Sequence, residues 1–484
     1  MEKNLKSKGT VAFLWDFFGK MARHGTIFIV TIFLARLLEP SEFGLIAMIM
    51  VIVMVAMVFT DVGLGGALIQ RRRVLPIHYS SVFYFNILIG GLLTMITFFS
   101  AGWISEFYNT PELLPITQVI SILFFITSFS SVQVSKLRKE LNYEALTKAD
   151  VGSAVLSGVL GIGLAFYGAG VWSLVAQALS RAVFHNLFLW SASKWIPSLH
   201  FSFKALTQLW GFGFRMFLSG LLEVIFTRLD IIIIGKLFSP TILGFYDQAK
   251  RLNDMLIQYS SGSIMSVLFP VLSKVQNDLP RFQNITIKTL GIISFIVFII
   301  LGSMYLVAEE LIVLLFTEKW QGAVIYFKLL LLSGFAYPVS ALLVNILSSR
   351  GNSKAFLRLE IYKKILLAIN LYIGFLWGIE GYLYGLVVVS ILGVSLNILF
   401  ASKEIKLPFY AFVKPIVTQM LIAVLSVLLV ILLTENIEMY AIIYMFIKGG
   451  LFITLYLLIN RIFKTPSSEY FYQQIFQILK RKRL

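Results

Sequence analysis

The chain of 484 residues contains no cysteine and only four histidines. Without cysteine there are no disulfides, no catalytic thiols and no cysteine-based metal sites. The histidines do not form an HExxH or similar metal motif, and the sequence lacks the GxxxxGK(S/T) loop that binds nucleotide phosphates. We therefore expect a protein without a metal or a cofactor that performs no enzymatic chemistry.

Charged residues are also scarce, at 13% of the chain against 58% hydrophobic residues. With a mean hydropathy of +0.86, such a chain cannot hide its apolar side chains inside a water-soluble globule. Its apolar runs of about 22 residues are long enough to cross a hydrocarbon core of roughly 30 Å. We expect an all-α integral membrane protein with about fourteen transmembrane helices. The runs lie near residues 12–37, 43–68, 80–104, 114–136, 147–167, 171–192, 207–237, 243–269, 287–308, 323–348, 359–379, 381–401, 415–434 and 439–462.

The net charge of +17 is unevenly distributed along the chain. If the N-terminus is cytoplasmic, the outer loops carry only Arg36, Lys236 and Lys319, whereas clusters such as RRR at 71–73 and KRKR at 480–483 fall inside. This asymmetry is the positive-inside pattern, and it predicts that both termini are cytoplasmic. We expect the basic clusters to contact anionic membrane lipids rather than nucleic acid.

Two similar stretches indicate an internal repeat. ARLLEPSEFGLIAM at 35–48 and GKLFSPTILGFYDQ at 235–248 share a leucine, a proline and a glycine at matching positions, and both cover a turn between the first two helices of a six-helix block. A parallel repeat predicts two pseudo-symmetric six-helix lobes around a central cavity. The expected divisions are an N-lobe at 1–192, a cytoplasmic linker at 193–206, a C-lobe at 207–401, two further helices at 402–462 and a basic amphipathic cytoplasmic tail at 463–484.

Charged residues inside the expected spans mark the candidate functional site, because a charge at membrane depth must face protein or water. Asp16, Lys20, Arg23 and His24 form one polar stripe on the first helix, with more cations than that helix neutralises. Similar stripes lie on the expected spans 171–192, 207–237 and 243–269. They contain Arg181, Arg215, Glu223, Asp230, Asp247, Lys250, Arg251 and Asp254. Two interpretations stay open: the charges form buried ion pairs that fix helix packing, or the surplus cations bind an anion.

Five stretches resemble the polysaccharide transporter family, the Wzx-type oligosaccharide flippases of the multidrug/oligosaccharidyl-lipid/polysaccharide flippase superfamily. They are ARLLEPSEFGLIAM, FTDVGLGGALIQ (59–70), SKLRKELNYEALTKADVGS (135–153), GAGVWSLVAQAL (168–179) and RLDIIIIGKLFSPTILGFYDQAKRL (228–252). The resemblance implies a flippase in the bacterial cytoplasmic membrane that moves undecaprenyl-diphosphate-linked oligosaccharides to the outer leaflet by alternating access. It also implies polysaccharide polymerases and glycosyltransferases as partners.

The same resemblance implies roles for the charged residues. The diphosphate would be held by Lys20, Arg23, Arg215, Lys250 and Arg251, and the stripes add His24 and Arg181 to the expected substrate cavity. Asp16, Asp61, Glu223, Asp230, Asp247 and Asp254 are expected to form ion pairs or to couple transport to an ion. Relatives that carry peptidoglycan precursor have an arginine on helix 2, which this chain lacks. That difference favours an exopolysaccharide, O-antigen or teichuronic-type cargo.

Two functions other than a flippase would require a different use of these charges. A cation-coupled drug or metabolite antiporter of the same superfamily would need acidic cavity residues, and the surplus of cations on the first helix argues against it. A membrane scaffold for polysaccharide assembly that does not transport would pair its charges internally and tolerate their neutralisation.

The positive-inside pattern gives a topology that reporter fusions can test. We expect a cytoplasmic signal for fusions at residues 73, 140, 200, 352 and 484, and an exterior signal at 40, 109, 240, 318 and 436. A cytoplasmic signal at 240 would contradict the two-lobe repeat, because it would invert the second lobe relative to the first.

Overall fold

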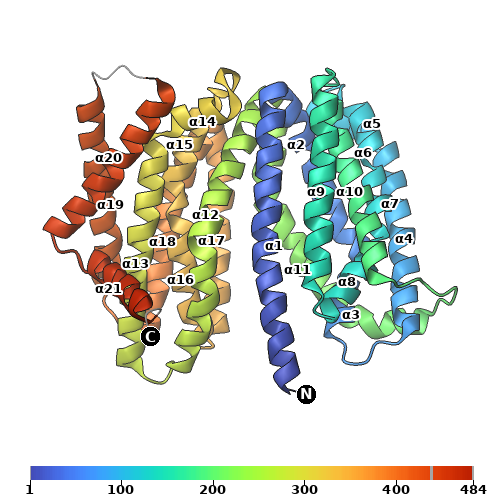
Figure 1. The fold of residues 1–484 in the computed structure, drawn as a ribbon, viewed down its shortest axis with the longest axis horizontal. Coiled ribbons are helices and arrows are strands. Elements are labelled where there is room, and N and C mark those ends of the chain that lie inside the picture. Colours follow the sequence, from blue (N-terminus) through green and yellow to red (C-terminus); the bar gives the residue numbers. More distant parts are fainter. Residues whose placement is uncertain (1, 436–439, 482–484) are drawn as a thin grey trace. The chain divides into compact units, whose positions relative to one another are not determined.

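The computed structural model describes residues 2–435 and 440–481, and the side chains of 9, 11–257, 271–435 and 440–473. Helices and turns make up this part of the chain, and no strand occurs in it. The helices group into two compact units, residues 1–247 and 248–484 (Figure 1). The all-α fold expected from the sequence is confirmed for the described residues.

The first unit contains eleven complete helices and the start of a twelfth. They are α1 (Glu2–Leu37), α2 (Pro40–Asp61), α3 (Leu64–Gln70), α4 (Pro76–Phe99), α5 (Ala101–Tyr108), α6 (Leu113–Ile120), α7 (Ile122–Ser128), α8 (Ser131–Lys139), α9 (Tyr143–Phe166), α10 (Val171–Ser193), α11 (Phe203–Leu237) and α12 (Pro240–Lys274). α9 lies between α1 and α10 and packs along both (Figure 1). A buried apolar cluster that includes Leu64, Phe83 and Leu209 joins α3, α4 and α11.

The second unit continues from α12 into nine further α-helices and two short 3₁₀ turns. They are α13 (Leu279–Leu306), α14 (Ala308–Phe316), η1 (Glu318–Trp320), α15 (Ala323–Gly334), α16 (Ala336–Ser349), α17 (Ser353–Gly374), η2 (Phe375–Trp377), α18 (Gly378–Ile405), α19 (Phe409–Thr434), α20 (Ala441–Ile462) and α21 (Pro466–Arg481). α13 is central and packs against α16, α19, α20 and α21.

The last three helices are held to this unit by polar contacts as well as apolar ones. Buried Gln419 donates to Asn460 over 2.9 Å and accepts from the Tyr456 hydroxyl over 2.6 Å, which joins α19 to α20. Lys448 on α20 forms a 2.6 Å ion pair with Glu310 on α14. The ring of Phe471 on α21 lies 5.0 Å from that of Phe295 on α13. The expected tail at 463–484 therefore begins as a packed helix, and its last residues, 482–484, lie outside the described chain.

Membrane-spanning length is confirmed for much of the chain. Ten stretches of the described residues are long and apolar enough to cross a bilayer. One of them, Ser353–Ile405, contains two long helices, α17 and α18. The chain is therefore a multi-pass membrane protein.

The division between the compact units differs in place from the expected lobe linker. Residues 194–202 do connect α10 to α11 without a helix, and the backbone amides of Ser198 and Ser202 donate to the hydroxyls of Ser80 and Ser81 on α4. However, α11 packs against α2 and α3, so the compact units separate later, between residues 247 and 248 within α12. The six-helix repeat stays a prediction.

The two similar stretches of sequence meet in space. A Cβ added to Gly44 would lie 1.8 Å from the backbone oxygen of Pro240, and one added to Gly244 would lie 1.9 Å from that of Pro40. Each turn thus presents its proline carbonyl to the glycine of the other turn. The repeated glycine is needed because any side chain would separate the two backbones.

Substituting Gly44 should therefore destabilise the protein. Gly44→Ala improves helix propensity, yet its methyl group forces two backbones apart, and overpacking of this kind costs about 1–3 kcal/mol. We expect a lower thermal unfolding midpoint for the purified protein in detergent. Gly163→Ala on α9 is the matched control, since its Cβ would meet open space. Equal midpoints for Gly44→Ala and the control would show that the turns do not pack this closely.

Candidate functional site

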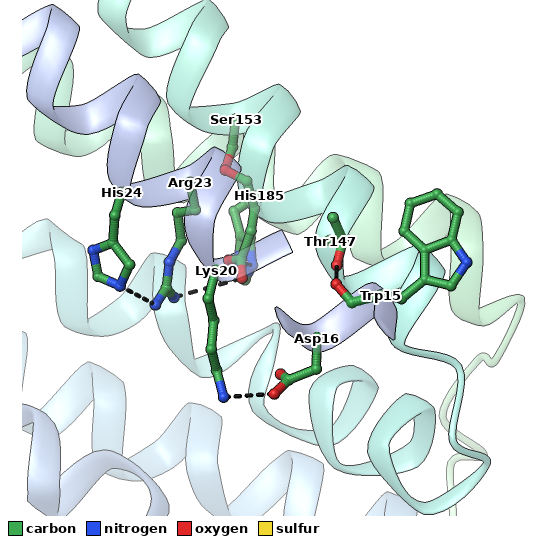
Figure 2. A network of polar contacts seen from close by, with 9 residues as sticks. Trp15, Asp16, Lys20, Arg23, His24, Thr147, Ser153 and His185 are labelled. Carbon is green, nitrogen blue, oxygen red and sulfur yellow. Dashed lines mark hydrogen bonds and ion pairs between the residues drawn. The ribbon is translucent and has the colours of Figure 1, made fainter. Parts of the chain in front are cut away.

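The cations expected on the first helix gather where α1 faces α9 and α10. The Arg23 guanidinium lies 3.6 Å from the Asp150 carboxylate of α9 and 3.3 Å from the His24 ring (Figure 2). Nε2 of His185, on α10, lies 3.2 Å from the other Asp150 oxygen. Arg181 on α10 is close enough to interact electrostatically with Asp150 and Arg23. The side chains of Arg23, Asp150 and His185 are about two-thirds buried or more, with 31%, 35% and 25% of their surface exposed.

A second ion pair lies one helical turn earlier on α1. Lys20 donates to Asp16 over 2.6 Å (Figure 2). Both side chains are more exposed than that of Arg23. Lys20, Arg23 and Asp150 line a pocket of about 140 Å³, together with Arg138 of α8 and His185. We call this pocket the α1 cation pocket.

The sequence brings α1 close to α9 at this level. A Cβ added to Gly19 would lie 2.2 Å from the Thr147 hydroxyl oxygen, so only glycine fits there. Thr147 in turn donates to the backbone oxygen of Trp15 over 3.0 Å (Figure 2). Asn142, whose side chain accepts from the Ala145 amide, caps the start of α9 and sets the register that places Asp150 opposite Arg23.

The α1 cation pocket has an excess of positive charge. Its lining contains three cations, Lys20, Arg23 and Arg138, and two carboxylates, Asp16 and Asp150. Arg181 does not line the pocket but adds positive charge close to Asp150 and Arg23. Within the described part of the chain, the buried Nε of Arg23 has no hydrogen-bond partner, although arginine presents donors suited to phosphate and carboxylate oxygens. The pocket can therefore bind an anion.

Asp61 has a local structural role in this unit. Its carboxylate accepts from the Ser131 hydroxyl over 2.5 Å and from the Gly65 amide over 3.0 Å, and it lies 3.4 Å from Asn86. These contacts tie α2 to the start of α3 and to α4 and α8. Its expected role in ion coupling stays a prediction.

The expected residues of α11 and α12 lie on other surfaces. Arg215 and Glu223 are exposed on α11, and neither lines the α1 cation pocket. Asp230 is buried and accepts a 2.5 Å hydrogen bond from Tyr246. Asp247, the last residue of the first unit, is buried. In the second unit Lys250 is partly buried, and Arg251 and Asp254 are exposed; all three take part in polar contacts.

Asp150, His185 and Arg138 were not among the site residues expected from the sequence. Asp150 falls inside the expected span 147–167, so the rule that a charge at membrane depth marks a site would have found it. The same rule applied to the expected span 359–379 would have found Glu360, Lys363 and Lys364. Arg138 carried no such signal, because it belongs to a basic cluster that was expected in a loop outside the membrane.

Comparison with known proteins identifies the family of this chain. The family model described as polysaccharide biosynthesis protein matches residues 33–325. The lipopolysaccharide biosynthesis protein WzxC of Escherichia coli K12 is 23% identical over 376 residues, covering 77% of this chain and 76% of that protein. The succinoglycan biosynthesis transport protein ExoT of Rhizobium meliloti is 26% identical over 329 residues, covering 67% and 66%.

Solved structures agree on the architecture. The lipid II flippase MurJ, in an inward closed conformation, superposes with a TM-score of 0.69 at 15% identity, over 96% of this chain and all of that chain. An inward-facing multidrug resistance transporter of the MATE family gives a TM-score of 0.58 at 16% identity, over 80% and 95%. The fold is thus that of the multi-pass transporters to which MurJ and MATE belong. The chain itself belongs to the polysaccharide biosynthesis protein family, as its sequence motifs had indicated.

The contacts of Arg23 predict energetic coupling to Asp150. Arg23→Gln and Asp150→Asn should each lower the thermal unfolding midpoint, and the double variant should lose less than the sum. We expect a coupling of about 1 kcal/mol, because the pair is largely shielded from water. The control cycle is Glu144→Gln with Lys148→Gln, an exposed pair on α9 whose coupling should be about 0.3–0.5 kcal/mol. Strict additivity at Arg23 and Asp150 would rule out the pairing.

Proposed function

We propose that this protein is a flippase that moves an undecaprenyl-diphosphate-linked oligosaccharide across the bacterial cytoplasmic membrane, from the inner to the outer leaflet, for surface polysaccharide synthesis. The observation that carries the proposal is the α1 cation pocket. The pocket has surplus positive charge, and the buried Nε of Arg23 has no partner among the described residues. Because Arg23 lies within the candidate membrane span Val11–Leu37, this arrangement suits a diphosphate that crosses the membrane.

The physical task of such a protein is to lower the cost of moving charge through lipid. A diphosphate that crosses roughly 30 Å of hydrocarbon unaided would lose its hydration, at a prohibitive cost in free energy. A polar path lined with cations supplies replacement contacts, while the apolar prenyl tail stays in the bilayer. The protein needs to make and break no covalent bond.

Relatives support the choice of cargo. WzxC is named for lipopolysaccharide biosynthesis and ExoT for succinoglycan biosynthesis and transport. TuaB of Bacillus subtilis, which is 29% identical over 286 residues, is named for teichuronic acid biosynthesis. An exopolysaccharide, O-antigen or teichuronic-type repeat unit is therefore the proposed cargo. Polysaccharide polymerases and glycosyltransferases of the same pathway are the proposed partners.

The transport cycle follows from the proposed architecture. Fourteen spans, with both termini in the cytoplasm, form two lobes that expose the central cavity to each leaflet in turn. The count of fourteen is supported by the ten apolar stretches, of which one contains two helices, and by the length of α10, α11 and α12, at about 1.5 Å per residue. Lys250 and Arg251 on α12 and Arg215 on α11 are the proposed further contacts to the lipid diphosphate.

The packing interpretation of the same charges predicts a different outcome on mutation. If Arg23 only fixes helices through Asp150, then Arg23→Gln, which keeps most of the side-chain volume, should lower stability and leave transport per molecule unchanged. If Arg23 also binds diphosphate, transport should fall at unchanged abundance. The two roles are thus separable by measuring both quantities.

Neutralising the α1 cation pocket should abolish flipping. We expect Lys20→Gln combined with Arg23→Gln to lose outer-leaflet exposure of the lipid-linked glycan at normal membrane abundance, since each charge-assisted contact is worth about 1.5–3 kcal/mol. Arg23→Lys should keep part of the activity, because an ammonium retains the charge but not the paired donors.

The measurement is exposure of lipid-linked glycan in a strain that lacks the native gene, with membrane abundance determined for each variant. Lys148→Gln is the matched control, because Lys148 is an exposed lysine of the same unit that pairs with Glu144. Normal exposure in the double variant would disprove the diphosphate grip.

A further inference from the structure

A second polar pocket lies entirely within the second unit. It measures about 410 Å³, in the range of about 300–1,000 Å³ typical of small-molecule sites, and its walls come from α12, α15, α16, α17 and α18. Its polar lining includes Asn253, Tyr337, Ser340, Glu360, Lys363 and Lys364. We call it the α17 pocket. None of its residues was among the expected site residues.

The charged face of α17 lies at membrane depth. Glu360, Lys363 and Lys364 share one side of the helix, whereas Ile361 and Ile365 expose about half of their surface on another side. Lys363 is roughly 15 Å from the start of α17, near the middle of a hydrocarbon core of about 30 Å. Charges at this depth need protein or water around them, so the α17 pocket is a hydrated space rather than a lipid-filled groove.

A buried, unsatisfied amide points into this space. Asn253 on α12 is only 5% exposed and lines the pocket, and its side-chain carbonyl oxygen has no hydrogen-bond partner among the side chains and backbone that the structure describes. Buried polar atoms in native proteins nearly always have a partner, so an orphan at a pocket wall indicates a ligand or water that supplies a donor. Across the pocket the Ser340 hydroxyl oxygen accepts from Asn397 over 2.7 Å, which leaves its own proton available.

The chemistry of the lining selects the class of ligand. Glu360 is already bound to Lys363 over 2.5 Å, and Lys364 adds a further positive charge, so a free cation is disfavoured. The Asn253 carbonyl accepts, Ser340 donates, and the Tyr337 side chain, 62% exposed, offers a ring face. Neutral acceptors and donors beside an aromatic ring match the hydroxyl groups and the apolar ring face of a sugar.

We propose that the α17 pocket binds a sugar of the lipid-linked glycan, separately from the α1 cation pocket that binds the diphosphate; this rests on the proposed function. The two pockets occupy related places. Asn142 begins α9 and Asn352 begins α17, both as caps that accept from the residue three positions on, and Asp150 and Glu360 follow at the same spacing. In α9 the carboxylate recruits Arg23 and His185 from other helices, whereas in α17 Glu360 is satisfied by Lys363 on its own helix, which leaves the larger space open.

The test compares lipids with and without a sugar on the purified full-length protein in detergent. The probes are undecaprenyl diphosphate and undecaprenyl diphosphate carrying glucose, galactose or N-acetylglucosamine, with the dissociation constants taken from intrinsic fluorescence. The wild type should bind at least one sugar-bearing lipid more tightly than the bare lipid. Asn253→Leu and Tyr337→Leu should each weaken that binding by about tenfold, as expected for the loss of one or two ligand contacts, and leave the bare lipid unaffected.

Control variants separate this proposal from the proposed function. Tyr384→Leu, on α18, removes a similarly exposed tyrosine outside the pocket and should change nothing. Lys20→Gln with Arg23→Gln should weaken bare and sugar-bearing lipids alike. If the wild type binds sugar-bearing lipid but not undecaprenyl diphosphate, the diphosphate grip fails and the sugar site stands.

Two results would overturn the sugar site. One is a wild type that prefers none of the three sugar-bearing lipids over the bare lipid. The other is a sugar preference that both Asn253→Leu and Tyr337→Leu retain. Tyr337 is exposed, so Tyr337→Leu decides the question even if Asn253→Leu does not fold.

Discussion

The structure depends on one constraint: a charged side chain inside the hydrocarbon of a membrane must be surrounded by protein or water. In the first unit, Arg23 on a spanning helix is enclosed by α9 and α10, which supply Asp150 and His185. In the second unit, Lys363 and Lys364 line the α17 pocket, while Ile361 and Ile365 on the same helix are about half exposed. The helices are arranged so that each unit keeps a polar interior within an apolar exterior, and that interior is where a charged or hydroxyl-rich molecule can reside.

Close packing of helices determines which side chains meet in these pockets. At Gly19 the absence of a side chain lets α1 approach Thr147 of α9, and this brings the cations of α1 within reach of Asp150. At the starts of α2 and α12, Gly44 and Gly244 allow each backbone to contact the proline carbonyl of the other.

Much of the fold was accessible from the sequence because it follows from composition and period. Long apolar runs predicted the spans, and the repeated turn predicted two elements that the structure brings into contact. The cations Lys20 and Arg23 were found by their depth in a span. Their partner Asp150 obeys the same rule but was missed, because it does not belong to a stripe of several charges on one helix face.

Other features were beyond sequence reasoning for a physical reason. The Asp61 carboxylate contacts the Gly65 amide, the Asn86 side chain and the Ser131 hydroxyl. Asn86 and Ser131 lie far along the chain, so no local spacing in the sequence predicts these contacts. The orphan carbonyl of Asn253 is a property of its surroundings, not of its residue type. The compact units divide within α12 because α11 packs against α2 and α3. Hydropathy along the sequence does not predict such a tertiary contact.

The two asparagine-capped helices, α9 and α17, differ in how their carboxylates are paired. α9 and α17 begin alike and place a carboxylate at the same spacing, Asp150 in one and Glu360 in the other. What differs is the origin of the counter-charge. When bases from neighbouring helices bind the carboxylate, they fill the space between helices and leave a compact pocket rich in cations, which suits a phosphate. When the counter-charge is one turn away on the same helix, the space between helices stays open, and hydroxyl, amide and aromatic groups can line it, which suits a sugar. The proposed cargo, a diphosphate-linked glycan, presents both kinds of group in one molecule, so one pocket of each kind would match it.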